Sequence, residues 1–270
     1  MKKKILLILA CILFLAACGK KEDRPPGEVL KASLEELEKK DSFTASYTSK
    51  QITTIEGEDH PYDLFSKIEM GNKENHYSKI DTHWPSIIPN VPDSDSTLYT
   101  LVNPDNPEEI FEYYQAGDTG KWEKEKLKTI EGTYTGQSGL AIYENFWEIV
   151  KSYFDSFQLL ERGVPLEDKK TDFYELTLSE DQVQEMNTQI KEGIEQITGQ
   201  EAEGYPKIKN YIMRIWIDPE TNLPLQAEIE NDMYTDSEVS LIHGSETLTY
   251  TGFDNVEQVS LPEEVVNNLQ

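Results

Sequence analysis

A β-hairpin is predicted by residues 207–233, which read KIKNYIMRIWIDPETNLPLQAEIENDM. Residues 207–218 and 225–233 both alternate between apolar and polar side chains, as strands with one buried face do. Residues 218–224 supply the Asp, Asn and Pro of a turn. In the second strand Ala227, Ile229 and Met233 are expected to face inward. The carboxylates between them, Glu228, Glu230 and Asp232, are then expected to form a solvated sheet face and not a metal site.

The pattern of apolar residues predicts the remaining elements. Helices are expected at residues 28–40, 140–160 and 180–197, the last opened by a capping box of Ser179 and Gln182. Runs rich in β-branched and aromatic residues predict strands at 43–55, 62–70, 76–81, 98–102, 110–115, 121–123, 172–178 and 238–253. The sequence therefore predicts one α+β domain over residues 28–270, a large antiparallel sheet with helices on one side.

The first residues predict export and lipidation. Three lysines at 2–4 precede an apolar run that ends at residue 17, which has the plan of a secretory signal and is too short to span a membrane. Leu15-Ala16-Ala17-Cys18 matches the lipobox of bacterial lipoproteins, in which the cysteine takes a diacylglyceryl group and the chain is cut before it. We therefore expect a signal peptide at 1–17, a lipidated tether at 18–27, and a palmitate-type anchor on Cys18.

The charge of the chain restricts its partners. The formal net charge is −26 at pH 7, with 51 acidic against 25 basic side chains. A surface this negative repels phosphate backbones, so nucleic acid is excluded as a partner. It also repels anionic lipid headgroups, so we expect the domain to stand off the bilayer on its tether.

No pattern of residues predicts catalysis, a cofactor or a metal site. The four histidines, His60, His76, His83 and His243, do not follow metal-binding spacing. Residues 136–139 lack the spacing of a nucleophile elbow, and His243-Gly244-Ser245 falls inside a predicted strand. Asp93-Ser94-Asp95 does not have the spacing of a calcium-binding loop. We therefore expect a protein that is not an enzyme.

Three segments resemble the LolA-like lipoprotein superfamily, which includes the LppX and LprG type of lipid carrier. They are the Asp41-Ser42-Phe43-Thr44 junction, the segment from Trp216 to Leu225 with its Asp-Pro-x-Thr-x-Leu-Pro turn, and the ending Leu261-Pro-Glu-Glu-Val-Val266. The chain looks like a member of the Gram-positive type. The resemblance implies a curved antiparallel half-barrel whose helices cover the concave face and an apolar cavity that holds acyl chains. It implies no catalytic residues.

The residues themselves supply a candidate lining for such a cavity. Apolar side chains on one side of the expected 140–160 helix would face the inward residues of the terminal strands. The candidates are Phe146, Trp147, Val150, Phe154, Phe157, Met213, Ile215 and Ile217. The alternative is that these side chains pack on one another as a closed core, because any amphipathic helix on a sheet has such a stripe.

Two functions remain open on the sequence. The first is a membrane-anchored envelope lipoprotein, on the extracytoplasmic face of the cell membrane, that binds or carries a lipid or another hydrophobic molecule. The second is a ligand-free interaction module that docks an envelope partner through its acidic surface. A void with apolar lining would favour the first function, and a filled interior would favour the second.

Overall fold

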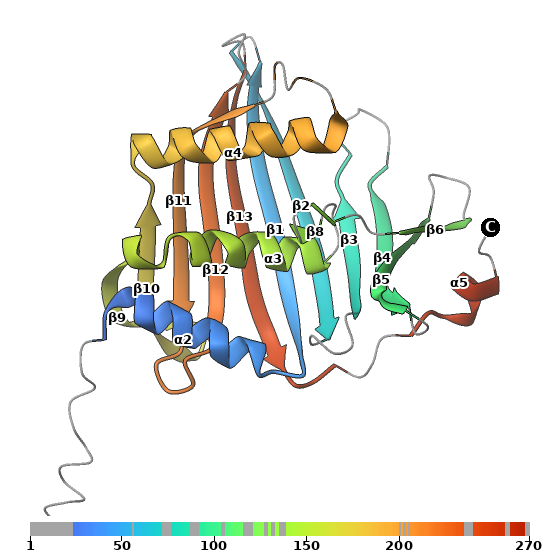
Figure 1. Cartoon of the computed structure of the whole chain (residues 1–270), viewed down its shortest axis with the longest axis horizontal. Coiled ribbons are helices and arrows are strands. Elements are labelled where there is room, and N and C mark those ends of the chain that lie inside the picture. The colour runs from blue at the N-terminus through green and yellow to red at the C-terminus, as the bar shows by residue number, and fades with distance from the viewer. Residues whose placement is uncertain are drawn as a thin grey trace, which may run out of the picture.

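An open, eleven-stranded antiparallel sheet forms the centre of the computed structural model (Figure 1). The structure describes residues 24–55, 57–71, 77–86, 92–103, 106–115, 121–126, 129–130, 133–134, 139–199, 201, 204, 206–234, 240–256 and 260–267. The signal peptide, Cys18, most of the tether, residues 136–138, His76 and the first residues of the expected last strand lie outside these ranges. The order of strands across the sheet is β6-β5-β4-β3-β2-β1-β13-β12-β11-β10-β9.

The strands of the large sheet follow the alternating stretches of the sequence. They are β1 (Ser42–Ile55), β2 (Glu58–Gly71), β3 (Tyr77–Trp84), β4 (Ser94–Asn103), β5 (Asn106–Gln115), β6 (Trp122–Lys126), β9 (Gln158–Leu166), β10 (Lys169–Thr177), β11 (Lys207–Ile217), β12 (Pro224–Tyr234) and β13 (Ser240–Phe253). Two short strands, β7 (Thr129–Ile130) and β8 (Thr133–Tyr134), form a separate pair. Sequential neighbours pair as hairpins, and the β1–β13 pairing joins the two ends of the domain.

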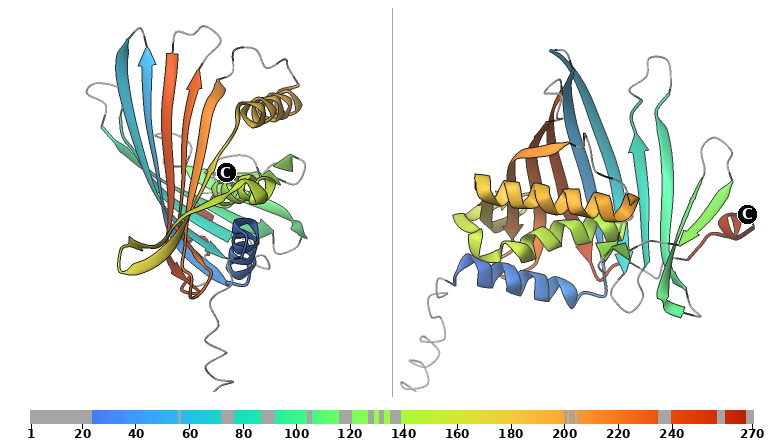
Figure 2. Two further views of the ribbon diagram at one scale, coloured as in Figure 1. Left: turned by 90° about the vertical axis from the view of Figure 1, so that its left-hand side faces the viewer. Right: turned by 45° about the horizontal axis from the view of Figure 1, so that its top comes forward.

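Three helices lie across one side of the sheet: α2 (Pro26–Glu38), α3 (Gly139–Ser152) and α4 (Glu180–Thr198), as Figures 1 and 2 show. A fourth, α5 (Glu263–Asn267), lies beside β5 and β6. The expected capping box opens α4, since the backbone N–H of Gln182 donates to Ser179 Oγ and that of Ser179 donates to Gln182 Oε1. Among the described residues, no helix combines the length and the apolar character needed to cross a bilayer.

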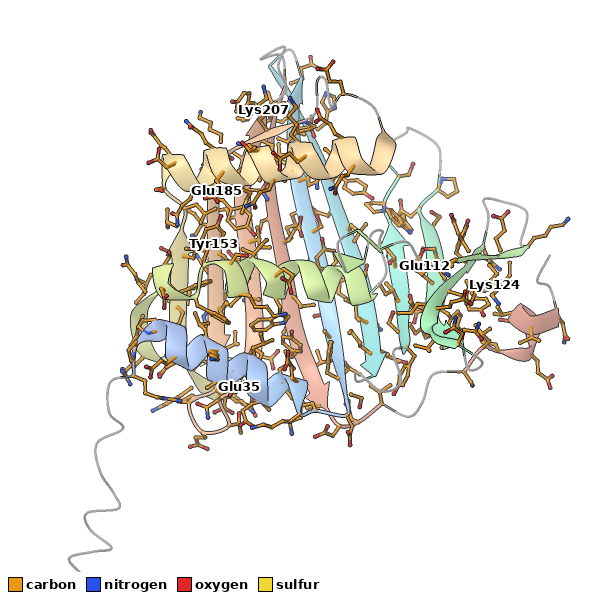
Figure 3. The ribbon with its side chains drawn as sticks, viewed as in Figure 1. Glu35, Glu112, Lys124, Tyr153, Glu185 and Lys207 are labelled. Carbon is orange, nitrogen blue, oxygen red and sulfur yellow. The ribbon has the colours of Figure 1, made fainter. Side chains whose placement is uncertain are left out.

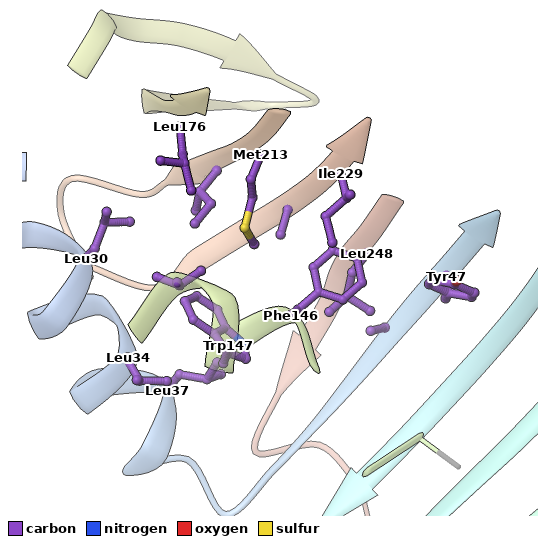
Figure 4. Close-up of a cluster of buried hydrophobic side chains, with 14 of the residues drawn as sticks. Leu30, Leu34, Leu37, Tyr47, Phe146, Trp147, Leu176, Met213, Ile229 and Leu248 are labelled. Atoms are coloured by element: carbon purple, nitrogen blue, oxygen red, sulfur yellow. The ribbon is translucent and has the colours of Figure 1, made fainter. Parts of the chain in front are cut away.

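The core lies between these helices and the middle of the sheet (Figure 4). Leu30, Leu34 and Leu37 follow one another at helical spacing on the buried side of α2. They join the buried face of β11, where every second residue from Tyr211 to Ile217 is at most 3% exposed. The predicted alternation of this strand is therefore confirmed.

The opposite side of the hairpin carries the predicted carboxylates. Arg214 bridges Glu175, Glu228 and Glu230 there, with nitrogen–oxygen distances of 3.0, 2.8 and 2.7 Å. These ion pairs are partly exposed to water. One arginine thus forms ion pairs with three carboxylates of this sheet face.

The prediction of a helix over residues 140–160 is wrong for the second half of that range. The α-helix ends at Ser152, a 3₁₀ turn (Phe154–Ser156) follows, and Phe157 has extended backbone angles before β9. Strand β9 lies at the edge of the sheet and exposes half of Leu160, so it lacks the alternation that marks a buried strand. At the other boundary, α2 already begins at Pro26, within the stretch expected to be tether.

A second, smaller cluster lies at the β6 edge. Tyr99, Tyr113, Trp122 and Val265 are buried there, the last contributed by α5. Lys124 lies on this end as well, with its Nζ 3.9 Å from the centre of the Phe111 ring (Figure 3).

Candidate functional site

A cavity of about 460 Å³ lies between α3 and the helix-bearing face of the sheet. Its sheet side is formed by strands β1, β2, β3, β11, β12 and β13, and α3 closes it from the other side. The lining residues are Tyr47, Ser49, Gln51, Tyr62, Leu64, Ser66, Thr82, Trp84, Phe146, Ile149, Tyr211, Ile229, Asn231 and Glu246. We call this cavity the α3 pocket.

The period of two along each strand explains why these residues share one face. Tyr47, Ser49 and Gln51 are alternate residues of β1, and β2 and β3 contribute alternate residues in the same way. Cross-strand register then aligns them in rows. One row reads Leu64, Ser49, Glu246, Ile229 and Met213, and the next reads Tyr62, Gln51, Gly244, Asn231 and Tyr211.

The pocket exists because small residues occupy the centre of these rows. Ser49 lies between Leu64 and Glu246, and Gly244 lies between Gln51 and Asn231. A Cβ atom on Gly244 would come within 3.1 Å of Asn231 Oδ1, so the absence of a side chain there leaves room for the amide. One row further toward α2, Leu248 and Ala227 pack closely with the helices, and the interior there is filled.

A carboxylate lies in the α3 pocket. Glu246 of β13 accepts a hydrogen bond from the hydroxyl of Tyr47, at 3.0 Å between the oxygens. Burial raises the pKa of the Glu246 carboxyl, and the hydrogen bond from Tyr47 opposes that rise. The pKa of Tyr47 is raised in turn by burial and by the negative charge of Glu246. Opposite them, Ser66 and Thr82 hydrogen bond to each other at 2.9 Å.

Two further polar groups in the lining have no hydrogen-bond partner among the described residues. They are the hydroxyl of Tyr211 and the side-chain oxygen of Asn231. Tyr211 is 3% exposed and Asn231 is 8% exposed, and the two residues pair directly across β11 and β12. Buried polar atoms without a partner are uncommon in folded proteins, so this pair marks the pocket as a place where a bound molecule can supply hydrogen bonds.

Of the eight lining candidates from the sequence, only Phe146 lines the α3 pocket. Six of the others are fully enclosed in the core: Trp147, Val150, Phe157, Met213, Ile215 and Ile217. Phe154 is partly buried against the same core. Trp147 also donates a hydrogen bond from Nε1 to the hydroxyl of Tyr250, at 2.9 Å, which fixes it in place. Apart from Phe146, these candidates therefore pack in the hydrophobic core and do not line the pocket.

The lining residues that the sequence did not predict come from β1, β2, β3, β11, β12 and β13, together with Ile149 of α3. Their signal was present in β1, where the inward positions Tyr47, Ser49 and Gln51 are small or polar. A strand with such a face cannot fill the space under a helix, so small inward residues indicated the hollow better than the aromatic stripe did.

The histidines and acidic residues do not assemble a reactive centre in the described part of the chain. No group of three or more His, Cys, Asp or Glu residues is arranged there to hold a metal ion. His243 contacts Asp232 at 2.7 Å on the outer face, and His83 contacts Asp95 at 2.9 Å near the end of β3. The hydrogen bond to Asp95 raises the pKa of His83.

No protein-family model and no curated protein matches this chain. A LolA superfamily protein from Nitrosomonas europaea superposes with a TM-score of 0.29 at 12% identity, covering 89% of this chain and 96% of the other. A putative outer membrane lipoprotein-sorting protein domain from Vibrio parahaemolyticus gives 0.29 at 10% identity, over 90% and 96%. A DUF1329 family protein from Desulfovibrio piger gives 0.31 at 10% identity, over 86% and 95%. These superpositions are loose, with TM-scores of 0.31 or lower.

Proposed function

We propose that this protein is an envelope lipoprotein that binds a hydrophobic molecule in the α3 pocket and does not transform it chemically. The observation that carries the proposal is the pocket itself. Its volume of about 460 Å³ lies within the range of roughly 300–1,000 Å³ typical of small-molecule sites. A closed interior was the alternative, and the pocket favours binding over a purely structural role.

The side of the pocket formed by Phe146, Ile149 and Leu64 suits an apolar tail. Each methylene group removed from water contributes about 0.8 kcal/mol. A tail that buries roughly six methylene groups would therefore contribute on the order of 5 kcal/mol, enough to offset much of the cost of association. An acyl or alkyl chain is accordingly the ligand class that we propose.

The proposed arrangement is a LolA-like half-barrel in which the helices cover the concave face of the sheet. The expected resemblance and the position of α2, α3 and α4 on one side of the sheet support it (Figure 2). In this arrangement α3 acts as the cover of the ligand. The ligand enters where the small residues of β1 and β2 leave space beneath it.

The proposed location is the extracytoplasmic face of the cell membrane, with the protein anchored by a lipid on Cys18. The lipobox at residues 15–18 supports this location. The variant Cys18→Ser is expected to lose labelling by radioactive palmitate and to leave the membrane fraction. Retention of the variant in the membrane fraction, with unchanged labelling, would contradict the anchor.

Binding in the pocket is tested by the variant Leu64→Trp. Leu64 lines the pocket from β2, and a larger apolar side chain there fills space without removing a hydrogen bond. We expect the affinity for a fluorescent long-chain probe to fall roughly tenfold or more, because about two methylene groups lose their place.

The neighbouring variant Phe65→Trp is the matched control. Phe65 is 41% exposed and faces the other side of the same strand, so this variant should bind the probe like the parent protein. Circular dichroism and thermal unfolding of both variants check the fold. A parent protein that binds no long-chain probe, or a Leu64→Trp variant that binds as well as the parent, would refute the proposed function.

A further inference from the structure

Among the residues that the structure describes, the lining of the α3 pocket contains hydrogen-bond acceptors and one carboxylate but no cation. Glu246 supplies the carboxylate, Asn231 an unpartnered oxygen, and Tyr211 an unpartnered hydroxyl. No lysine, arginine or histidine is among the fourteen lining residues. A ligand carboxylate or phosphate would therefore be placed near a negative charge without a balancing positive one.

Register places these three groups close together on one face. Asn231 and Tyr211 are directly opposite each other on β12 and β11. Glu246 pairs with Ile229 and so lies diagonally across from Asn231. Diagonal neighbours on a sheet face have their Cβ atoms roughly 7–8 Å apart, a span that one ligand headgroup can bridge.

No basic side chain is found beside Glu246 among the described residues of the lining. The hydrogen bond from Tyr47 is the one that the Glu246 carboxylate accepts among the described side chains, and burial raises the pKa of Glu246. A bound cation would supply the missing counter-charge. The rest of the molecule acts in the same direction, since a net charge of −26 attracts cations toward the surface and repels anions.

We propose that the ligand of the α3 pocket is an amphiphile with a positively charged amine. Its ammonium group binds Glu246, Asn231 and Tyr211, and its apolar tail lies against Phe146, Ile149 and Leu64. The inference rests on the proposed function and narrows its ligand to one chemical class. Fatty acids and anionic lipids are then poor ligands.

Three probes with the same tail and different headgroups test the inference: dodecylamine, dodecanol and dodecanoic acid. Binding to the full chain is measured by titration calorimetry at pH 7, below the concentration at which each probe forms micelles. We expect dodecylamine to bind roughly tenfold or more tightly than dodecanol, because a hydrogen bond to a charged group is stronger than one between neutral groups. Dodecanoic acid is expected to bind most weakly.

The variant Glu246→Gln keeps the shape of the side chain and removes its charge. It should lose the preference for the amine while binding dodecanol as the parent does. Glu69→Gln, on the outward face of β2, removes the same net charge away from the pocket and should keep the preference. Tyr211→Phe, which removes one unpartnered hydroxyl, should weaken the binding of dodecylamine and leave the affinity for dodecanol unchanged.

The outcomes separate the two claims. Equal binding of the amine and the alcohol, tighter binding of the acid, or an amine preference that survives Glu246→Gln would overturn the inference and leave the hydrophobic pocket standing. Failure of all three probes to bind would overturn the proposed function and the inference together.

Discussion

Glu246 is one of 51 acidic residues, and nothing in its immediate sequence separates it from the others. Its role depends on which face of β13 it occupies and on which residues lie beside it. Both follow from register, because a shift of one residue would move it to the outer face. Single residues of the core were predictable from alternation, whereas the residues of the pocket required the pairing of distant strands.

A second acidic residue, Glu112, is expected to make folding pH-dependent. It lies on β5 beside Glu125 of β6, and one of its oxygens is buried without a partner among the described residues (Figure 3). Burial and the charge of Glu125 raise the pKa of Glu112 to about 7. The folded protein therefore holds a proton that the unfolded chain has already lost.

Since the folded pKa is the higher one, the contribution of Glu112 to stability is full below the ordinary glutamate pKa and is lost as pH rises through about 7. Glu112→Gln should unfold at higher urea concentration than the parent protein at pH 8 and show no such gain at pH 4. Urea unfolding across this pH range is the measurement. The variant Glu58→Gln is the control, because Glu58 is exposed at the start of β2. The same gain at both pH values would contradict the assignment.

At the scale of the elements, the sequence predicted most strands and all three helices of the sheet face. The alternation of β11 and β12 and the capping box of α4 were readable because each depends on residues close in sequence. The end of α3 could not be predicted from the sequence in the same way. The aromatic residues at 146, 147, 154 and 157 all enter one core, although the chain changes from helix to 3₁₀ turn to strand between them.

The capping box of α4 has a measurable energy. Ser179→Ala removes the oxygen that accepts from the backbone of Gln182, so we expect a loss of about 1 kcal/mol in the free energy of unfolding. Ser179→Asp restores an acceptor at the same position and should recover most of the loss. Chemical unfolding of both variants measures these changes in the free energy of unfolding. A Ser179→Ala variant as stable as the parent would show that the cap does not contribute to stability.

The molecule as a whole has an open sheet, helices on one of its sides, and a strongly negative charge. The sequence predicted the large antiparallel sheet and the helices on one of its sides. It did not predict where the interior is hollow, because the hollow lies beneath α3 where Ser49 of β1 and Gly244 of β13 are neighbours in the sheet although they are far apart in sequence. Large apolar residues mark where a core is filled, and small inward residues mark where it is not.

A crystal structure of the protein grown with dodecylamine would show what the α3 pocket binds. The account predicts an alkyl chain beneath α3, in contact with Phe146, Ile149 and Leu64, and its nitrogen within hydrogen-bonding distance of Glu246. An α3 pocket filled by protein side chains, with the amine bound elsewhere or absent, would contradict it.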